Sequence, residues 1–151
     1  MGPSKESWEQ LQEMRNADEL VIPPRVNPNE LRIGNIVLHP PKSRDEWFEI
    51  NVTAVHILSA ANGMFFQPIP LTEERLLKFG FKNTDNEIDY SDFVKSHVSI
   101  NGCGSDKQEP FSFVLYINYR EHKIEIKYVH QLQNLYFALT GEELQLQNPV
   151  L

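Results

Sequence analysis

The sequence predicts an α+β protein: a small antiparallel SH3-like β-barrel or sheet with two short helices packed on it, preceded by an N-terminal helical arm. Three observations predict this class. Several segments alternate apolar and polar residues with the period of two that is typical of β-strands. Two short segments follow the helical period and end at a glycine. Asparagine, glycine and proline mark turns between these segments.

Composition limits the class of protein. The chain has 151 residues and is 40% hydrophobic, which suits one packed domain that needs no disulfide or metal to fold. Its formal net charge of -7 disfavours a phosphate backbone as the main partner, although it does not exclude a local basic patch. The lone cysteine, Cys103, cannot form an internal disulfide and indicates a reducing compartment. With no signal-peptide core and no apolar run of membrane-spanning length, we expect a cytoplasmic protein without a membrane partner.

Residues 1–27 are predicted to form a helical arm and a proline-rich linker, separate from a single β-rich domain at 28–151. Ser7 and Gln10 have the spacing of a capping box at the start of a helix. The apolar stripe of this helix consists of Trp8, Leu11 and Met14. The stripe has two interpretations: it packs back on its own domain, or it binds a partner.

The first strands are expected between residues 36 and 70. Ile36 to Leu38 is a short apolar run that two prolines end, and residues 47–60 alternate as a long β-branched strand. Asn62 and Gly63 then predict a tight hairpin turn, because both tolerate positive φ. Residues 64–70 are expected to return as the next strand of the barrel.

A capped helix is expected after this strand. Thr72 is a suitable N-cap, and two glutamates follow in the first turn, where the helix dipole favours acidic side chains. Gly80 is suited to the left-handed residue that ends the helix. The residues expected to be buried are Leu76, Leu77 and Phe79.

Further strands and a second helix complete the predicted domain. Short strands are expected around residues 93–100, and residues 111–119 and 122–129 predict an antiparallel hairpin. The last helix runs from Val129 and ends at Gly141. Its apolar stripe consists of Val129, Leu132, Leu135, Tyr136 and Leu139. An adjacent stripe consists of His130, Gln133, Asn134 and Phe137.

This last helix carries the candidate binding residues. One interpretation is that the second stripe only flanks the core and makes local hydrogen bonds. The other is that His130, Gln131 and Asn134 converge on a ligand or partner, since amides and a neutral imidazole both donate and accept.

No cluster in the sequence predicts catalysis, a metal or a cofactor. The acidic run from Asp85 to Asp92 resembles the start of a calcium loop, but Tyr90 stands where its glycine is required and Ser96 where its last carboxylate is required. Cys103 has no recognisable activating base, and no histidine has metal-ligand spacing to another ligand. The sequence therefore favours a non-enzymatic protein.

Three blocks of the sequence resemble an uncharacterised family of small proteins from Bacteroidota and their phages and prophages. These blocks are "ELRIGN" at 30–35, "PIPLTEERLLKFGF" at 68–81 and "IKYVHQLQNLYFALTGEEL" at 126–144. The resemblance implies a small cytoplasmic protein, often carried by mobile elements, and it transfers no catalytic or binding residue.

Two functions are expected from these observations. The first is a non-enzymatic binding protein, phage- or prophage-associated, that acts through protein–protein contacts. The alternative is a small β-barrel that binds nucleic acid or a nucleotide, because basic and aromatic residues interleave in residues 119–128.

Overall fold

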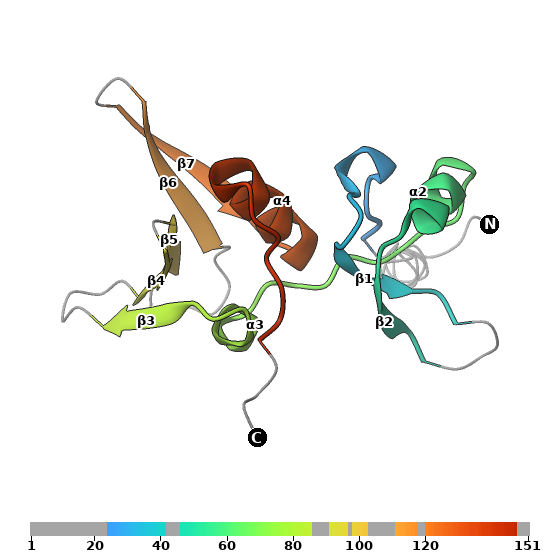
Figure 1. The fold of residues 1–151 in the computed structure, drawn as a ribbon, viewed down its shortest axis with the longest axis horizontal. Helices are drawn as coiled ribbons and strands as arrows, with labels where there is room; N and C mark the ends of the chain where they lie inside the picture. The colour runs from blue at the N-terminus through green and yellow to red at the C-terminus, as the bar shows by residue number, and fades with distance from the viewer. Residues whose placement is uncertain are drawn as a thin grey trace, which may run out of the picture.

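The computed structural model describes residues 24–41, 46–85, 91–96, 98–102, 111–117 and 120–147 (Figure 1). The predicted arm with Trp8, Leu11 and Met14 lies outside the described residues, as does Cys103. The described residues form an α+β fold with two antiparallel sheets. None of the helices in the described ranges is long and apolar enough to cross a membrane.

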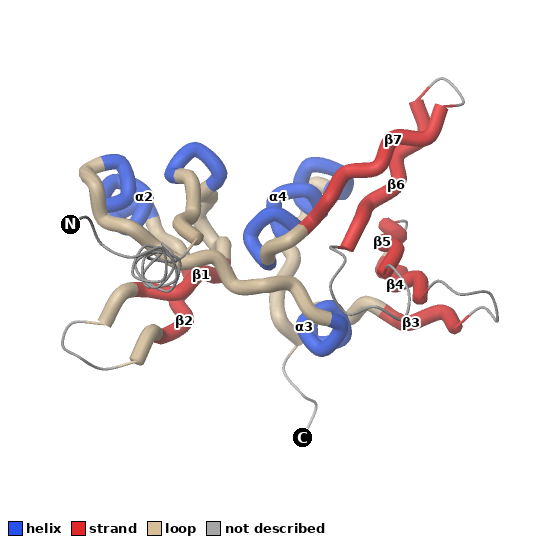
Figure 2. Tube along the Cα trace, turned by 180° about the vertical axis from the view of Figure 1, so that it is seen from behind, coloured by secondary structure: helices blue, strands red, loops and turns tan. Residues whose placement is uncertain are grey.

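The elements form two groups along the chain. The first group, here called the small lobe, consists of η1 (Pro28–Glu30), β1 (Ile36–His39), β2 (Phe48–Asn51) and α2 (Ala54–Ala61). The second, here called the sheet lobe, consists of α3 (Glu73–Lys78), β3 (Lys82–Asp85), β4 (Ser91–Lys95), β5 (Val98–Gly102), β6 (Phe111–Ile117), β7 (Arg120–Ile126) and α4 (Val129–Thr140). Figure 2 shows the two groups side by side, with α4 facing the small lobe.

The SH3-like barrel is not found in the described residues. The sheet lobe contains an open five-stranded antiparallel sheet in the order β3-β4-β5-β6-β7, and β1 and β2 form a separate two-stranded sheet. A closed barrel requires the first and last strands to pair, and β3 and β7 are the two edges here. The predicted hairpin of residues 111–119 and 122–129 is confirmed as β6 and β7.

Residues 54–61 are helical, so the prediction of one long strand over residues 47–60 is wrong beyond Asn51. Thr53 is the N-cap, and its backbone N–H donates to His56 Nδ1 over 3.0 Å. The helix buries Ala60 and half-buries Ile57, while Val55 and Leu58 are exposed. The half-buried Ile57 and the buried Ala60 are therefore three residues apart, as in a helix, although the sequence around them alternates and is β-branched.

The predicted hairpin turn at Asn62 and Gly63 is also wrong. Asn62 is the C-cap of α2, and Gly63, with φ 97°, follows it as the helix ends. Residues 64–70 then form isolated bridges in place of a strand: Leu38 with Gln67, and Pro70 with Tyr128.

The prediction of α3 is confirmed at both ends. Thr72 Oγ1 accepts from Arg75 N–H over 3.3 Å, and Gly80 follows the helix with φ 82°. Leu76 and Phe79 are fully buried. Leu77 is 53% exposed, so its predicted burial is wrong.

Strand β1 joins the two hydrophobic cores. Ile36 belongs to the core of the sheet lobe, and its neighbour Val37 belongs to the core of the small lobe. This division follows from the alternation of side chains along a strand. Phe66 and Val52 fill the small core beside Val37, whereas the aromatic and aliphatic side chains under α3 and α4 fill the larger one.

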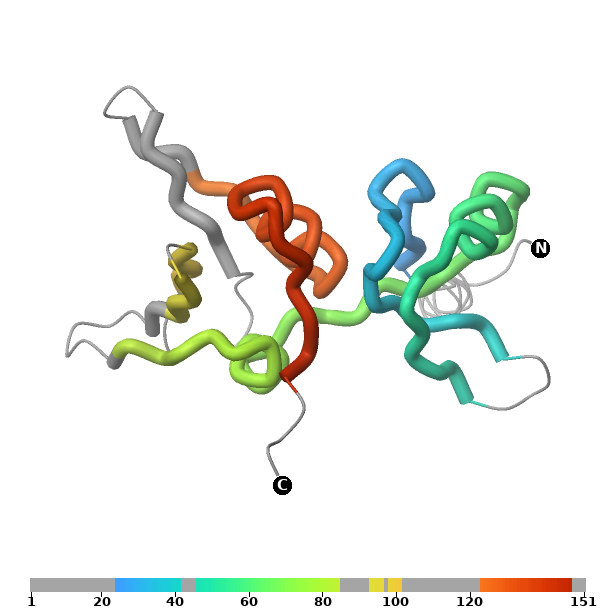
Figure 3. Tube along the Cα trace, viewed as in Figure 1, coloured from blue at the N-terminus to red at the C-terminus, as the bar shows by residue number. Residues whose placement is uncertain are grey.

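The chain enters and leaves the described fold at different lobes. Val26 is buried in the small core, and its N–H donates to Phe66 O over 2.9 Å. After α4 the chain runs back to α3, as Figure 3 shows, and Gln147 N–H donates to Lys78 O over 2.8 Å. Residues 141–147, here called the return segment, include the buried Leu144.

Candidate functional site

The polar stripe of α4 faces the segment Glu30–Ile36. His130 Nε2 lies 3.1 Å from Glu30 Oε2. Asn134 Nδ2 donates to Glu30 O over 2.6 Å, and Asn35 Nδ2 donates to Asn134 Oδ1 over 2.9 Å. These bonds join the block "ELRIGN" to the block at 126–144, and backbone bonds of Ile69 and Leu71 join the block at 68–81 to that same segment.

The side chain of Gln133 makes three hydrogen bonds to backbone groups. Its Oε1 accepts from Ile36 N–H over 2.8 Å. Its Nε2 donates to Gly34 O over 3.1 Å and to Leu144 O over 3.3 Å. The side chain is 2% exposed, so one buried amide holds α4, the start of β1 and the return segment together.

Arg32 joins the segment Glu30–Ile36 to Phe137 of α4 and to Glu143 of the return segment. Its Nη2 donates to Glu143 Oε1 over 2.8 Å, and its Cζ lies 3.8 Å from the centre of the Phe137 ring. Its Nη1 is buried without a hydrogen-bond partner. The face of Phe137 covers the guanidinium, and this cation–π contact offsets part of the lost hydration.

An open groove of about 830 Å³ lies beside these residues. Segments far apart in sequence form it: residues 32–36, Asn51, Gln133 of α4, and residues 143–146. Two apolar side chains that line the groove are exposed, Ile33 at 62% and Leu146 at 37%. The groove therefore offers apolar contacts above a wall that Gln133 fixes in place.

The three predicted binding residues all have partners within the protein. His130 and Asn134 bond to Glu30, as described above, and Gln131 Oε1 accepts from Lys127 N–H over 3.1 Å. The groove is lined by their neighbour Gln133 and by Arg32 and Ile33 from the other block.

Sequence reasoning missed this groove for a physical reason. Its walls lie next to one another because Gln133 bonds to residues 97 and 99 positions earlier in the chain and to Leu144 O, and because Arg32 pairs with Glu143. The one local signal was the amide at Gln133, which occupies a helical face together with two further polar side chains.

Burial lowers the pKa of His130, whose side chain is 1% exposed, and the hydrogen bond and charge of Glu30 oppose that shift. A lowered folded-state pKa means that the unfolded chain binds the proton more readily. The free energy of unfolding is therefore expected to fall as the pH drops below roughly 6.5, the ordinary histidine value. Urea unfolding between pH 7.5 and 5.5 measures this loss.

Two variants separate this contribution from other titrating groups. In His130→Gln the loss below pH 6.5 should shrink, whatever the stability of the variant at pH 7.5. In Glu30→Gln it should grow, because the carboxylate that opposes the shift is gone. An unchanged pH dependence in both variants would contradict this role of His130.

Within the described residues, no three His, Cys, Asp or Glu side chains gather as a metal site. Neither His56 nor His130 lines the groove. Comparison with protein-family models, with curated proteins and with solved structures finds no match. The resemblance to small proteins of Bacteroidota and their phages thus stays a prediction.

Proposed function

We propose that this chain is a non-enzymatic binding protein that holds an extended, apolar segment of a partner protein in the groove. The observation that supports this proposal is the exposure of Ile33 and Leu146 within one groove. A volume of about 830 Å³ falls in the usual range of binding pockets, roughly 300–1,000 Å³.

The charges of the groove favour an uncharged segment. Arg32 and Glu143 are paired with each other over 2.8 Å, so the cation and the anion on this wall neutralise one another. A charged ligand that paired with Arg32 or Glu143 would break this ion pair, and that loss would offset part of the free energy of the new contact. An apolar segment needs no such exchange.

The amides of the groove suit the backbone of an extended peptide. Asn51 and Gln145 line the groove, and an amide side chain both donates and accepts. An extended peptide presents N–H and C=O groups that need such partners once water is displaced. Apolar contact with Ile33 and Leu146 then supplies the main free energy of binding.

The resemblance noted above suggests which partner to seek. Proteins carried by phages and prophages act among host and phage proteins, and we propose a partner of one of these two kinds. This part of the proposal depends on the sequence resemblance alone.

The nucleic-acid alternative has less support. Its basis was the basic and aromatic side chains of residues 119–128. Lys127 Nζ lies 3.4 Å from Glu125 Oε2, so a carboxylate already accompanies one of those cations. The nearby carboxylate of Glu125 would repel a ligand phosphate that approached Lys127.

Selection from a displayed library of random peptides tests the proposed function. The selected peptides are then titrated calorimetrically into the parent chain and into Ile33→Asp and Leu146→Asp. Each substitution places a carboxylate against an apolar ligand, and we expect at least about a tenfold loss of affinity, or roughly 1.4 kcal/mol. Leu77→Asp is the matched control, because Leu77 is 53% exposed on α3 and does not line the groove.

Two outcomes would refute the groove as the binding site. One is that selection enriches no peptide. The other is that the enriched peptides bind Ile33→Asp and Leu146→Asp as tightly as the parent. Oligonucleotide binding with a steep loss between about 50 and 200 mM salt would instead favour the nucleic-acid alternative.

A further inference from the structure

We propose that two copies of this chain form a dimer through the outer face of α2, with the two helices antiparallel about a two-fold axis at Leu58. This face, here called the α2 ridge, consists of Ala54, Val55, Leu58 and Ala61. None of the residues that line the groove belongs to α2, so the ridge and the groove are different surfaces.

The α2 ridge exposes large apolar side chains on one side of a helix. Val55 is 70% exposed and Leu58 is 65% exposed, the two largest exposed fractions among the large hydrophobic side chains of the described residues. Ala54 and Ala61 are exposed beside them. At 3.6 residues per turn, these four positions lie within an arc of about 120°. The inner side of α2 is also apolar, and a helix that is apolar all round is normally buried, so we expect a partner on the ridge.

The α2 ridge carries no charge, and neither does the sequence around it. Residues 50–72 contain no aspartate, glutamate, lysine or arginine, although the chain has 14 basic and 21 acidic residues. This charge-free run is the longest in the chain. Two copies of an acidic protein repel each other where their charged surfaces meet, and salt screens charges that lie more than about 10 Å apart. A contact through α2 therefore adds no like charge across the interface.

The absence of charge also argues against other classes of partner. A nucleic acid needs lysine or arginine for its phosphates, and a helix that lies on a membrane surface is usually rich in both on its polar side. Residues 50–72 supply neither. The ridge therefore favours an uncharged, apolar protein surface, and a second copy presents such a surface.

The order of side chains along the ridge is complementary to itself. When two α2 helices are antiparallel about an axis at Leu58, Ala54 of one copy lies beside Ala61 of the other, and this small pair occurs twice. Small side chains let two helices approach to the lower end of the usual range of about 8–10 Å. The two Leu58 side chains then pack against each other in the space that the alanines leave.

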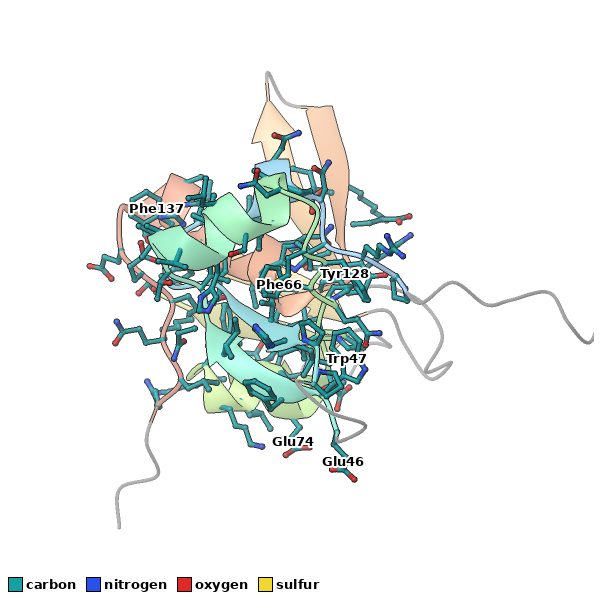
Figure 4. The ribbon with its side chains drawn as sticks, turned by 90° about the vertical axis from the view of Figure 1, so that its right-hand side faces the viewer. Glu46, Trp47, Phe66, Glu74, Tyr128 and Phe137 are labelled. Atoms are coloured by element: carbon teal, nitrogen blue, oxygen red, sulfur yellow. The ribbon has the colours of Figure 1, made fainter. Side chains whose placement is uncertain are left out.

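The position of α2 in the fold leaves room for a second copy. Figure 1 places α2 at the end of the molecule opposite β3, and Figure 4, which views that end, shows α2 on the near side. A helix of 8 residues is about 12 Å long, so the contact is smaller than the roughly 800 Å² per partner of a standard interface. We therefore expect a weak dimer whose population depends on concentration.

Sedimentation equilibrium of the full chain, from about 10 µM to about 1 mM, tests the dimer. The weight-average mass should rise from that of one chain towards that of two. Leu58→Asp should weaken self-association at least about tenfold, because it places two carboxylates together at the axis. Leu77→Asp is the matched control, since Leu77 is 53% exposed on α3 and the same charge there should leave the association unchanged.

Opposite charges at Leu58 show whether the partner is a second copy. Leu58→Lys should also lose self-association, because two ammonium groups then meet at the axis. An equimolar mixture of Leu58→Asp and Leu58→Lys should associate at least severalfold more tightly than either variant alone, since the axis now joins opposite charges. Three results would overturn the proposal: the mass of one chain at every concentration, the same loss in Leu77→Asp as in Leu58→Asp, or a mixture that associates no better than its components.

Discussion

Replacing Gln133 by leucine is expected to lower the free energy of unfolding by about 3–5 kcal/mol. The substitution keeps the apolar stem but removes the partners of Ile36 N–H, Gly34 O and Leu144 O. Leaving a buried polar group unsatisfied costs about 1–3 kcal/mol, and three are left here. Since small proteins are stable by only about 5–15 kcal/mol, urea unfolding at pH 7.5 should show a markedly lower midpoint.

Gln131→Leu is the matched control for this prediction. Gln131 lies two residues away on the same helix, and its side chain accepts one hydrogen bond from Lys127 N–H at an exposed site. We expect that substitution to cost less than about 1 kcal/mol. Equal losses in the two variants would show that the bonds of Gln133 do not hold the fold together.

Replacing Phe79 by alanine is expected to cost about 3–5 kcal/mol, the usual loss for a buried aromatic side chain. Phe79 is 0% exposed and lies in the core of the sheet lobe, at the end of α3. Its backbone O also accepts a hydrogen bond from Lys95 Nζ, so the cavity would open beside a part-buried cation. Thermal unfolding followed by circular dichroism should show a large drop in midpoint.

Leu77→Ala provides the comparison within the same helix. Leu77 is 53% exposed and alanine favours helices, so we expect a change of less than about 0.5 kcal/mol. A loss at Leu77 as large as that at Phe79 would mean that the sheet lobe buries the other side of α3.

The sequence was most informative where local chemistry sets the structure. Thr72, Gly80 and Gly141 mark helix ends through their own side chains or their tolerance of positive φ, and all three act as predicted. The hairpin of β6 and β7 was also predicted, because its strands are close in sequence and alternate clearly.

Residues 54–61 show where local pattern was insufficient. Alternation and β-branched residues favoured a strand, yet the segment buries Ala60 and half-buries Ile57 against the small core. Burial of one side of the segment in the small core and the N-cap at Thr53 favour the helix. Because residues 54–61 form a helix, the expected barrel lacks its longest predicted strand. The sheet lobe instead contains an open sheet of five strands.

The candidate groove was beyond the reach of local pattern. Ile33 and Leu146 become neighbours only through the fold, because Gln133 bonds both to the start of β1 and to the return segment. Helical periodicity identified His130 and Asn134 as a polar face, but their partners, Glu30 and Asn35, lie about a hundred residues earlier.

Amide hydrogen exchange of the chain with a selected peptide tests the proposed groove most directly. Backbone amides of residues 32–36 and 143–146 should exchange more slowly in the complex, since the peptide excludes water from both walls. When the same peptide is added to Ile33→Asp, the exchange rates of those amides should not change. Slowing confined to β3–β7, or equal slowing in Ile33→Asp, would contradict the account.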